Sequence, residues 1–338
     1  MAREERQALI SRLEEKRGSR VLCILTSDRM NAQGIFAKDF IPVAYNHLRA
    51  FGSFEHLDVF LFTLGGDTQA AFGFSRAVRG FGARQVSVLV PEKCHSAGTL
   101  FAIGANQIVM TAVATLTPID PSVTTPLNPQ VEVGPGQRQS VPVSVESVAG
   151  YRDLVQKDWK LDEPGTAAAF RVLAEKVNPL ALGDVYRSRE QIALLARKLL
   201  MLHRHDDSGI TKITESLTRS LGSHDYLISR AEAQEIFGKD QIPDPDPTEI
   251  ELIWDLFSDF AADMKLGQPF DALSILNNAV ASNIPTPVRD AQQIVKIESA
   301  SRSDVWERDL LLNFITLAPG QPEQVQIRPL YNDWRRQP

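Results

Sequence analysis

The stretch LVPEKCHSAGTLFAIGANQIVM, residues 89–110, places a short polar loop between two apolar runs. The first run ends at Val90 and is typical of a strand buried on both faces. The second run opens with the tetrapeptide SAGT at 96–99 and predicts a short helix, followed by another strand from residue 107. A serine followed by two small residues therefore lies at the tip between a buried strand and a helix.

The same alternation of strand and helix continues upstream with short connections. Strands are expected in RVLCILTS at 20–27, in LDVFLFTLGGDT at 57–68, where the strand runs into a glycine turn, and in RQVSVLVPEK at 84–93, with helices at 36–51 and 67–82. Regular alternation of this kind implies parallel strands that are joined by right-handed crossovers. Residues 20–123 therefore predict an α/β core.

The rest of the chain divides by composition. Residues 1–19 predict a charged N-terminal helix rather than a signal peptide. Residues 124–145 are rich in Pro, Gly, Gln and Val, which indicates an exposed excursion such as a hairpin or a lid within a mostly helical continuation to residue 240. A Pro/Asp-rich linker then separates 20–240, expected as one domain, from an appended α+β region at 248–338, whose expected role is assembly or partner binding.

Composition excludes several classes of protein. The net charge of -6 lacks the basic excess of a nucleic-acid binder, and 43% hydrophobic residues indicate a globular protein. Two cysteines are too few for a disulfide framework, so we expect a cytoplasmic protein. No apolar run approaches the roughly 18 residues of a membrane span. His203 and His205 are two residues apart and share no helix face, so we expect no metal and no cofactor.

The first candidate site is the pair Gly65-Gly66, which follows the second predicted strand. Paired glycines at a strand-to-helix turn let backbone N–H groups point at a ligand, which can be a phosphate or the oxyanion of an acyl-transfer intermediate. The surrounding sequence matches neither the Walker A nor the G-x-G-x-x-G pattern. A tight turn without any ligand is the alternative interpretation.

The second candidate is Ser96. Its small neighbours leave room for a substrate, and a serine between strand and helix follows the logic of a nucleophile elbow, although residues 94–98 read CHSAG rather than G-x-S-x-G. A helix N-cap is the alternative role for this serine. Both candidates follow parallel strands, so both are expected at one edge of the sheet, where the glycine turn can supply an oxyanion hole. This combination favours a serine nucleophile.

These motifs together resemble the serine dehydrogenase proteinase family, which belongs to the Clp protease and crotonase superfamily and is related to signal peptide peptidase A. The resemblance covers roughly residues 20–240 and is carried by TLGGDT, VPEKCHSAGTLFAIGANQIVM, ATLTPIDPSV and SHDYLISRAEAQEIFG. It implies a spiral of ββα units, serine peptidase activity and a homo-oligomer. It also implies Ser96 as the nucleophile, with oxyanion-hole amides from Gly65, Gly66 and Ala97.

The chain departs from the family pattern in three places. No N-terminal membrane helix is expected, Thr117 stands where a glycine is expected, and Leu227 stands where a proline is usual. Residues 248–338 lie outside the resemblance. The chain is therefore expected to be a divergent relative.

The general base is left open by the sequence. His224, which Asp225 could orient, is one candidate; the alternative is that it pins the loop before the next helix. His95 is adjacent to the nucleophile, so its side chain is expected to point elsewhere. Asp120 lies near the place where the Clp proteolytic subunit carries its histidine, and it could orient a histidine or hold a turn. A Ser-Lys dyad is the other route, with three candidate lysines: Lys93, Lys198 and Lys212.

The sequence thus predicts a serine peptidase that cleaves peptides or unfolded protein segments through a Ser96 acyl-enzyme. A crotonase-type acyl-thioester enzyme is a second hypothesis, and its catalytic carboxylate would have to be Asp67 or Asp120. A catalytically inactive scaffold of the same fold that binds a protein partner is the third.

Overall fold

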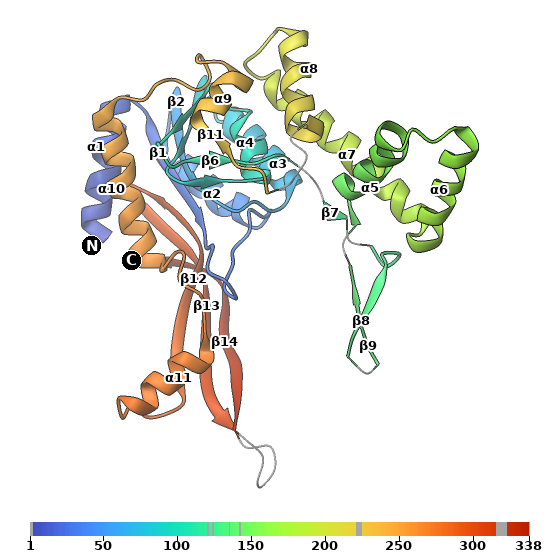
Figure 1. The fold of residues 1–338 in the computed structure, drawn as a ribbon. Coiled ribbons are helices and arrows are strands. Elements are labelled where there is room, and N and C mark those ends of the chain that lie inside the picture. Colours follow the sequence, from blue (N-terminus) through green and yellow to red (C-terminus); the bar gives the residue numbers. More distant parts are fainter. Residues whose placement is uncertain are drawn as a thin grey trace. The chain divides into compact units, whose positions relative to one another are not determined.

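A computed structural model describes residues 3–119, 122–123, 125–134, 136–141, 143–220, 225–315 and 323–337. The chain forms two compact units (Figure 1). Unit 1 comprises Met1–Thr115 and Ser229–Pro338, and unit 2 comprises Leu116–Ile228. Each unit is described by itself below.

Unit 1 is built on a seven-stranded sheet in the order β14-β13-β12-β1-β2-β3-β5. Its parallel part consists of β1 (Arg20–Thr26), β2 (His56–Phe62), β3 (Gln85–Val90) and β5 (Gln107–Met110). After its first residue, each of these strands is buried throughout, because helices cover both faces of the sheet. The prediction of an α/β fold is confirmed, while the finer prediction of a ββα spiral stays a prediction.

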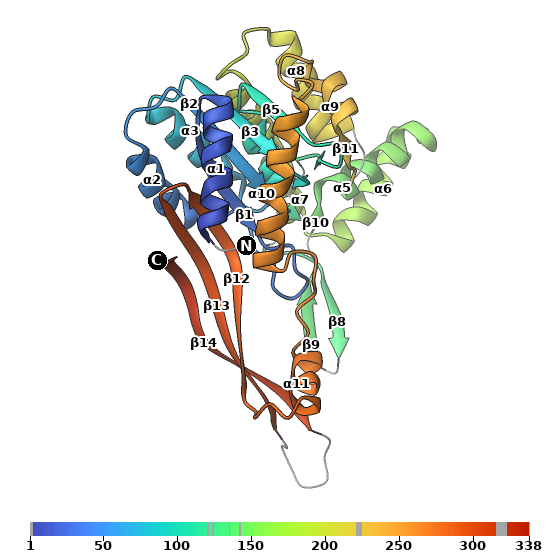
Figure 2. The same ribbon diagram turned by 90° about the vertical axis from the view of Figure 1, so that its left-hand side faces the viewer.

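One face of the sheet is covered by α1 (Arg3–Arg17) and α10 (Pro247–Met264), which lie side by side in Figure 2. Leucine, isoleucine and phenylalanine side chains of both helices pack on the strands in one apolar core; examples are Leu13 on α1, Phe60 on β2 and Phe260 on α10. Residues far apart in the sequence therefore build the same layer.

The other helices of unit 1 are α2 (Phe40–Phe51), α3 (Thr68–Gly80), α4 (Ala97–Ala102), α9 (Arg230–Phe237) and α11 (Ala272–Ala281). Four buried phenylalanines join the segments around the first three of these helices through ring contacts: Phe36, Phe40, Phe74 and Phe101. Residues 36–39 were expected to be helical, but α2 begins only at Phe40. Phe36 instead forms a parallel bridge with Gly66.

The C-terminal strands extend the same sheet. Strand β12 (Val288–Ser299) pairs antiparallel with β1, and β13 (Arg302–Ile315) and β14 (Gln324–Gln337) follow outward. The division into 20–240 and 248–338 that the sequence suggests therefore differs from the compact units of the structure. The Pro/Asp stretch is irregular up to its end, where it leads into a helix: Asp246 caps α10 by accepting hydrogen bonds from the N–H groups of Thr248 and Glu249.

Unit 2 is mostly helical. Its helices are α5 (Val145–Asp153), the π-helix η1 (Leu154–Asp158), α6 (Glu163–Lys176), α7 (Pro179–Leu200), α8 (Asp207–Glu215) and the π-helix η2 (Ser216–Ser220). Strands β8 (Gln130–Gly134) and β9 (Gln137–Ser140) form an antiparallel hairpin, and β7 (Ser122–Val123) pairs with β10 (Val143–Ser144). The excursion at 124–145 thus contains a hairpin, which is one of its two expected forms.

The chain leaves unit 1 through β6 (Thr115–Leu116) and returns through β11 (Ile228–Ser229). With β4 (Lys93–Cys94), these strands form a small three-stranded sheet in the order β11-β6-β4. Across the ranges that the structure describes, no helix has the length and apolar character needed to cross a membrane.

Candidate active site

Ser96 lies at the tip between β4 and α4 in an unusual backbone conformation. Its φ is 50° and its ψ is -110°, in a region that residues with a side chain rarely adopt. Ser96 occupies the N-cap position of α4, yet its side chain makes no capping hydrogen bond. The helix-cap alternative therefore does not explain this serine, whereas a strained strand-to-helix turn is the feature of a nucleophile elbow.

The structure brings the Gly65-Gly66 turn against Ser96. A Cβ atom added to Gly65 would lie 2.7 Å from the Ser96 Cβ and 3.3 Å from the Ser96 Oγ, and φ at Gly65 is 111°. A Cβ atom added to Gly66 would lie 2.4 Å from the carbonyl oxygen of Phe36, and φ there is 150°. Both positions thus require glycine, for their backbone conformation and for the close approach of neighbouring groups.

The two glycine amides have different surroundings. Gly65 is buried, and its N–H donates a hydrogen bond of 3.0 Å to Thr63 Oγ1. Gly66 is exposed, and its N–H has no acceptor among the described residues. The N–H of Ala97 likewise has no acceptor within the described ranges. The resemblance named all three amides for the oxyanion hole, but that of Gly65 is engaged elsewhere.

Thr63 connects the two turns and was not singled out from the sequence. Its N–H donates to the Lys93 carbonyl at 2.9 Å, and its carbonyl accepts from the His95 N–H at 3.0 Å. The Thr26 hydroxyl donates to Thr63 Oγ1 at 2.9 Å. The signal in the sequence is a hydroxyl residue at the end of a buried apolar run, two positions before the first glycine of the Gly-Gly pair.

The small residues after Ser96 serve packing. Ala97 and Gly98 are buried, and a Cβ atom added to Gly98 would lie 2.6 Å from Thr63 Cγ2 and 3.2 Å from Cys94 Sγ. Packing beneath Ser96 thus requires glycine at position 98, while the expectation that these residues leave room for a substrate stays a prediction. Burial raises the pKa of the Cys94 thiol, so this neighbour stays protonated and does not compete as a nucleophile.

Two base candidates in unit 1 are engaged with other groups. The Nε2 atom of His95 lies 2.8 Å from Thr115 Oγ1, so the ring is engaged with Thr115. Lys93 Nζ lies 2.7 Å from Asp28 Oδ2 and 3.3 Å from Glu92 Oε1. Burial on its own lowers the Lys93 pKa, but the hydrogen bond and charge of Asp28, helped by Glu92, raise it above its ordinary value. Lys93 is therefore held protonated and is unsuited to accept a proton.

The other candidates lie elsewhere in the chain. His224 and Asp120 are outside the described residues. Asp225 is exposed, as are Lys198 on α7 and Lys212 on α8, all within unit 2. Within the described ranges, no group of His, Cys, Asp and Glu side chains could hold a metal ion, and the pair His203 and His205 does not form one.

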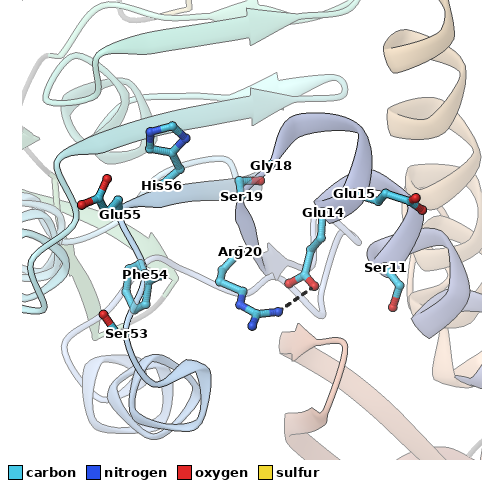
Figure 3. A pocket seen from close by; sticks show the side chains of 10 residues that line it. All are labelled: Ser11, Glu14, Glu15, Gly18, Ser19, Arg20, Ser53, Phe54, Glu55 and His56. Carbon is cyan, nitrogen blue, oxygen red and sulfur yellow. Dashed lines mark hydrogen bonds and ion pairs between the residues drawn. The ribbon is translucent and has the colours of Figure 1, made fainter.

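A separate polar cavity of about 590 Å³ lies at the amino ends of β1 and β2 (Figure 3). The side chains that line it include Arg20 and His56, at the first positions of these strands, and Glu14 on α1. Arg20 is paired with Glu14, at 3.4 Å between Nη1 and Oε2. The Ser96 turn follows the carboxyl end of β3, so this cavity belongs to the opposite edge of the sheet and is not part of the candidate site.

An α/β sheet that presents a strained serine against a glycine turn, with two amides that find no acceptor among the described residues, defines a candidate serine-hydrolase site. The comparison with protein families agrees with this class. Residues 1–134 match the family model of the ClpP-like SDH-type serine proteinases. The resemblance that the motifs predicted is thereby confirmed over residues 1–134.

Individual relatives are distant. An uncharacterized protein of Methanocaldococcus jannaschii is 24% identical over 237 residues, which are 68% of this chain and 71% of the relative. Among solved structures, a serine-to-alanine mutant of the 1510-N membrane-bound stomatin-specific protease matches at 13% identity and a TM-score of 0.38, covering 69% of this chain and 83% of its own. A lysine-to-alanine mutant of that protease, in complex with a substrate peptide, matches at 14% identity and a TM-score of 0.36, covering 63% of this chain and 71% of its own.

Proposed function

We propose that this protein is a serine peptidase that cleaves peptides or unfolded protein segments through a Ser96 acyl-enzyme. The observation that carries the proposal is the strained Ser96 turn, packed against a glycine turn whose exposed Gly66 amide has no acceptor among the described residues. The match of residues 1–134 to a serine proteinase family supports a peptidase. The resemblance also suggests a homo-oligomer, while the cysteine count and the net charge favour a cytoplasmic protein that binds no nucleic acid.

The proposed reaction follows from these groups. Ser96 Oγ attacks the carbonyl carbon of the scissile peptide bond while a base takes the hydroxyl proton. The carbonyl oxygen becomes an oxyanion, which the N–H groups of Gly66 and Ala97 stabilise. Collapse of the tetrahedral intermediate breaks the C–N bond, and the amine leaves with the proton. Water then hydrolyses the acyl-enzyme by the same route and regenerates Ser96.

We assign the general base to His224, with Asp225 or Asp120 in a supporting role. The assignment rests on the resemblance and on the engagement of the nearer candidates, because His95 contacts Thr115 and Lys93 is paired with two carboxylates. A Ser-Lys dyad that uses Lys198 or Lys212 is the competing assignment. A His224→Ala variant with unchanged hydrolysis would favour the lysine.

The proposed peptidase differs from a crotonase-type enzyme because its reaction needs a nucleophile. A crotonase-type reaction needs a free carboxylate in the site. The carboxylate of Asp67 instead caps α3 by accepting from the Gln69 N–H at 2.7 Å, and it lies 3.3 Å from Lys38 Nζ. These contacts make Asp67 a poor catalytic group and favour the peptidase.

The test is labelling of the purified protein with a fluorophosphonate probe, read by intact mass. We expect one adduct on the wild-type protein and none on Ser96→Ala. Ser53→Ala is the matched control, because it removes an exposed serine outside the site and should leave labelling unchanged. An adduct that persists in Ser96→Ala, or no adduct on folded wild-type protein alongside an active peptidase, would overturn the proposal.

A further inference from the structure

We propose that Thr63 is the positioning residue of the oxyanion hole, which it aligns with the nucleophile through its buried hydroxyl. This inference rests on the proposed function, because it assigns a role within that site. Thr63 touches neither substrate nor reacting atoms; it acts through Gly65. Its placement between the two turns of the site carries the argument.

The hydroxyl of Thr63 holds the Gly65-Gly66 turn through a hydrogen bond. Thr63 Oγ1 accepts hydrogen bonds from the Gly65 N–H at 3.0 Å and from the Thr26 hydroxyl at 2.9 Å. Both threonines are buried, with exposed fractions of 0% for Thr63 and 1% for Thr26. A buried N–H that loses its acceptor is costly, so the turn would rotate to find another acceptor. Such a rotation would move the peptide unit that carries the Gly66 N–H.

The backbone of Thr63 holds the turn that carries Ser96. Its N–H and carbonyl bond to the residues on either side of Cys94, which is two positions before Ser96. Its methyl group lies beneath Gly98. One residue thus holds the oxyanion turn by its hydroxyl and the nucleophile turn by its main chain. The distance between attacking oxygen and hole amide is therefore set through Thr63.

The hydroxyl and the methyl group have separable roles. Thr63→Ser keeps the hydroxyl and removes the methyl group, whereas Thr63→Ala removes both and differs from the serine variant by one oxygen atom. Thr63→Val keeps the shape and loses the hydroxyl. Thr26→Val is the matched control, because it removes the neighbouring buried hydroxyl without removing the acceptor of the Gly65 N–H.

The experiment measures the rate of fluorophosphonate labelling and, with a peptide substrate, kcat and KM separately. Removing one oxyanion-hole donor typically costs 10²–10³-fold in kcat, so misdirecting one should cost at least about tenfold. We expect this loss in kcat for Thr63→Ala and Thr63→Val, with KM changed less than about threefold. Thr63→Ser and Thr26→Val should stay within about threefold of wild type in kcat.

A purely structural role would give a different pattern. Loss of rate that follows stability across the variants, with Thr26→Val as impaired as Thr63→Val, would overturn the inference. Wild-type kcat in Thr63→Ala would overturn it as well. If Thr63→Val fails to fold, the Ser and Ala variants still decide, since they differ only in the oxygen atom.

Labelling of the wild-type protein separates failure of this inference from failure of the proposed function, and hydrogen exchange tests the inference without relying on activity. An unlabelled wild-type protein would refute the peptidase. A labelled wild type with normal Thr63→Ala would refute only the role of Thr63. We expect the Gly65 amide to exchange at least about tenfold faster in Thr63→Ala than in Thr63→Ser. Equal exchange rates in the two variants would show that the hydroxyl does not hold the turn.

Discussion

Substitution of Gly65 by alanine tests the geometry of the site most directly. The new Cβ atom would lie 2.7 Å from the Ser96 Cβ, where ordinary contacts begin at 3.4 Å, and 3.1 Å from the His95 carbonyl oxygen. One of the two turns must therefore move by roughly 0.7 Å, given those two distances. The substitution acts on the nucleophile and on the oxyanion turn together.

The size of the effect follows from two contributions. A φ of 111° costs a residue with a side chain about 1–3 kcal/mol, and overpacking of a close contact costs about another 1–3 kcal/mol. The free energy of unfolding should thus fall by about 2–6 kcal/mol. Because a misplacement of about 1 Å can cost 10²-fold in rate, we expect labelling of Ser96 to slow on the order of a hundredfold.

Gly82→Ala is the matched control. Gly82 has a φ of 90° with no atom within 4 Å of an added Cβ, so its substitution introduces backbone strain alone. Urea denaturation should show a loss of about 1–3 kcal/mol for this variant, with unchanged labelling. Wild-type labelling by folded Gly65→Ala would refute the packing of the two turns. Equal slowing in Gly82→Ala would show that the effect is not specific to the site.

Three further predictions concern stability and the base. Arg6→Met leaves the buried Glu298 carboxylate without its arginine, so urea denaturation should show a loss of about 3–5 kcal/mol, against at most about 1 kcal/mol for Arg20→Met at the surface. Burial lowers the pKa of His47 below its ordinary 6.5. As the pH falls below 6.5, the unfolded chain therefore binds a proton at His47 before the folded chain does. The free energy of unfolding should therefore be fully maintained above pH 6.5 and fall below it, with a shallower fall in His47→Gln; identical pH profiles would contradict this. Lys93→Met should keep labelling within about tenfold of wild type, because its ammonium is held protonated by its carboxylate partners; complete loss would instead make Lys93 part of the catalytic machinery.

The local pattern was sufficient to predict the parallel part of the sheet. Strands that are buried on both faces give continuous apolar runs, so β1, β2 and β3 were recognisable one by one. Short connections between them then implied that the Gly65-Gly66 turn and Ser96 emerge at one edge. The close approach of Gly65 to Ser96 follows from that topology.

The place of the C-terminal strands could not be read in the same way. Ile24 on β1 faces Ile297 on β12, and no local pattern specifies a partner so far away in the chain. The Pro/Asp stretch before α10 also looks like a linker in composition, although Asp246 and Pro247 are the ordinary first residues of a helix. Composition thus indicated a domain boundary before α10, although α10 packs beside α1 in one layer of unit 1.

The role of Thr63 was hidden for a different reason. A threonine at the end of an apolar strand is common, because its branched side chain suits a sheet. Its importance lies in the partners of its hydroxyl and main chain, which come from β1, the glycine turn and the Ser96 turn. Those partners are known only once the topology is known.

The conformation of Ser96 has a cost that its position in the helix does not explain. An N-cap serine ordinarily takes an extended backbone and bonds to the first turn, as Ser229 does at the start of α9. Ser96 has a positive φ and no capping bond, a state that costs about 1–3 kcal/mol and persists only where the surroundings enforce it. The hydrogen bonds of the Thr63 main chain, which donates to the Lys93 carbonyl and accepts from the His95 N–H, supply that enforcement. A fold that holds a serine in strain, beside a Gly66 amide that has no acceptor among the described residues, gives up stability for the geometry that the proposed nucleophile requires.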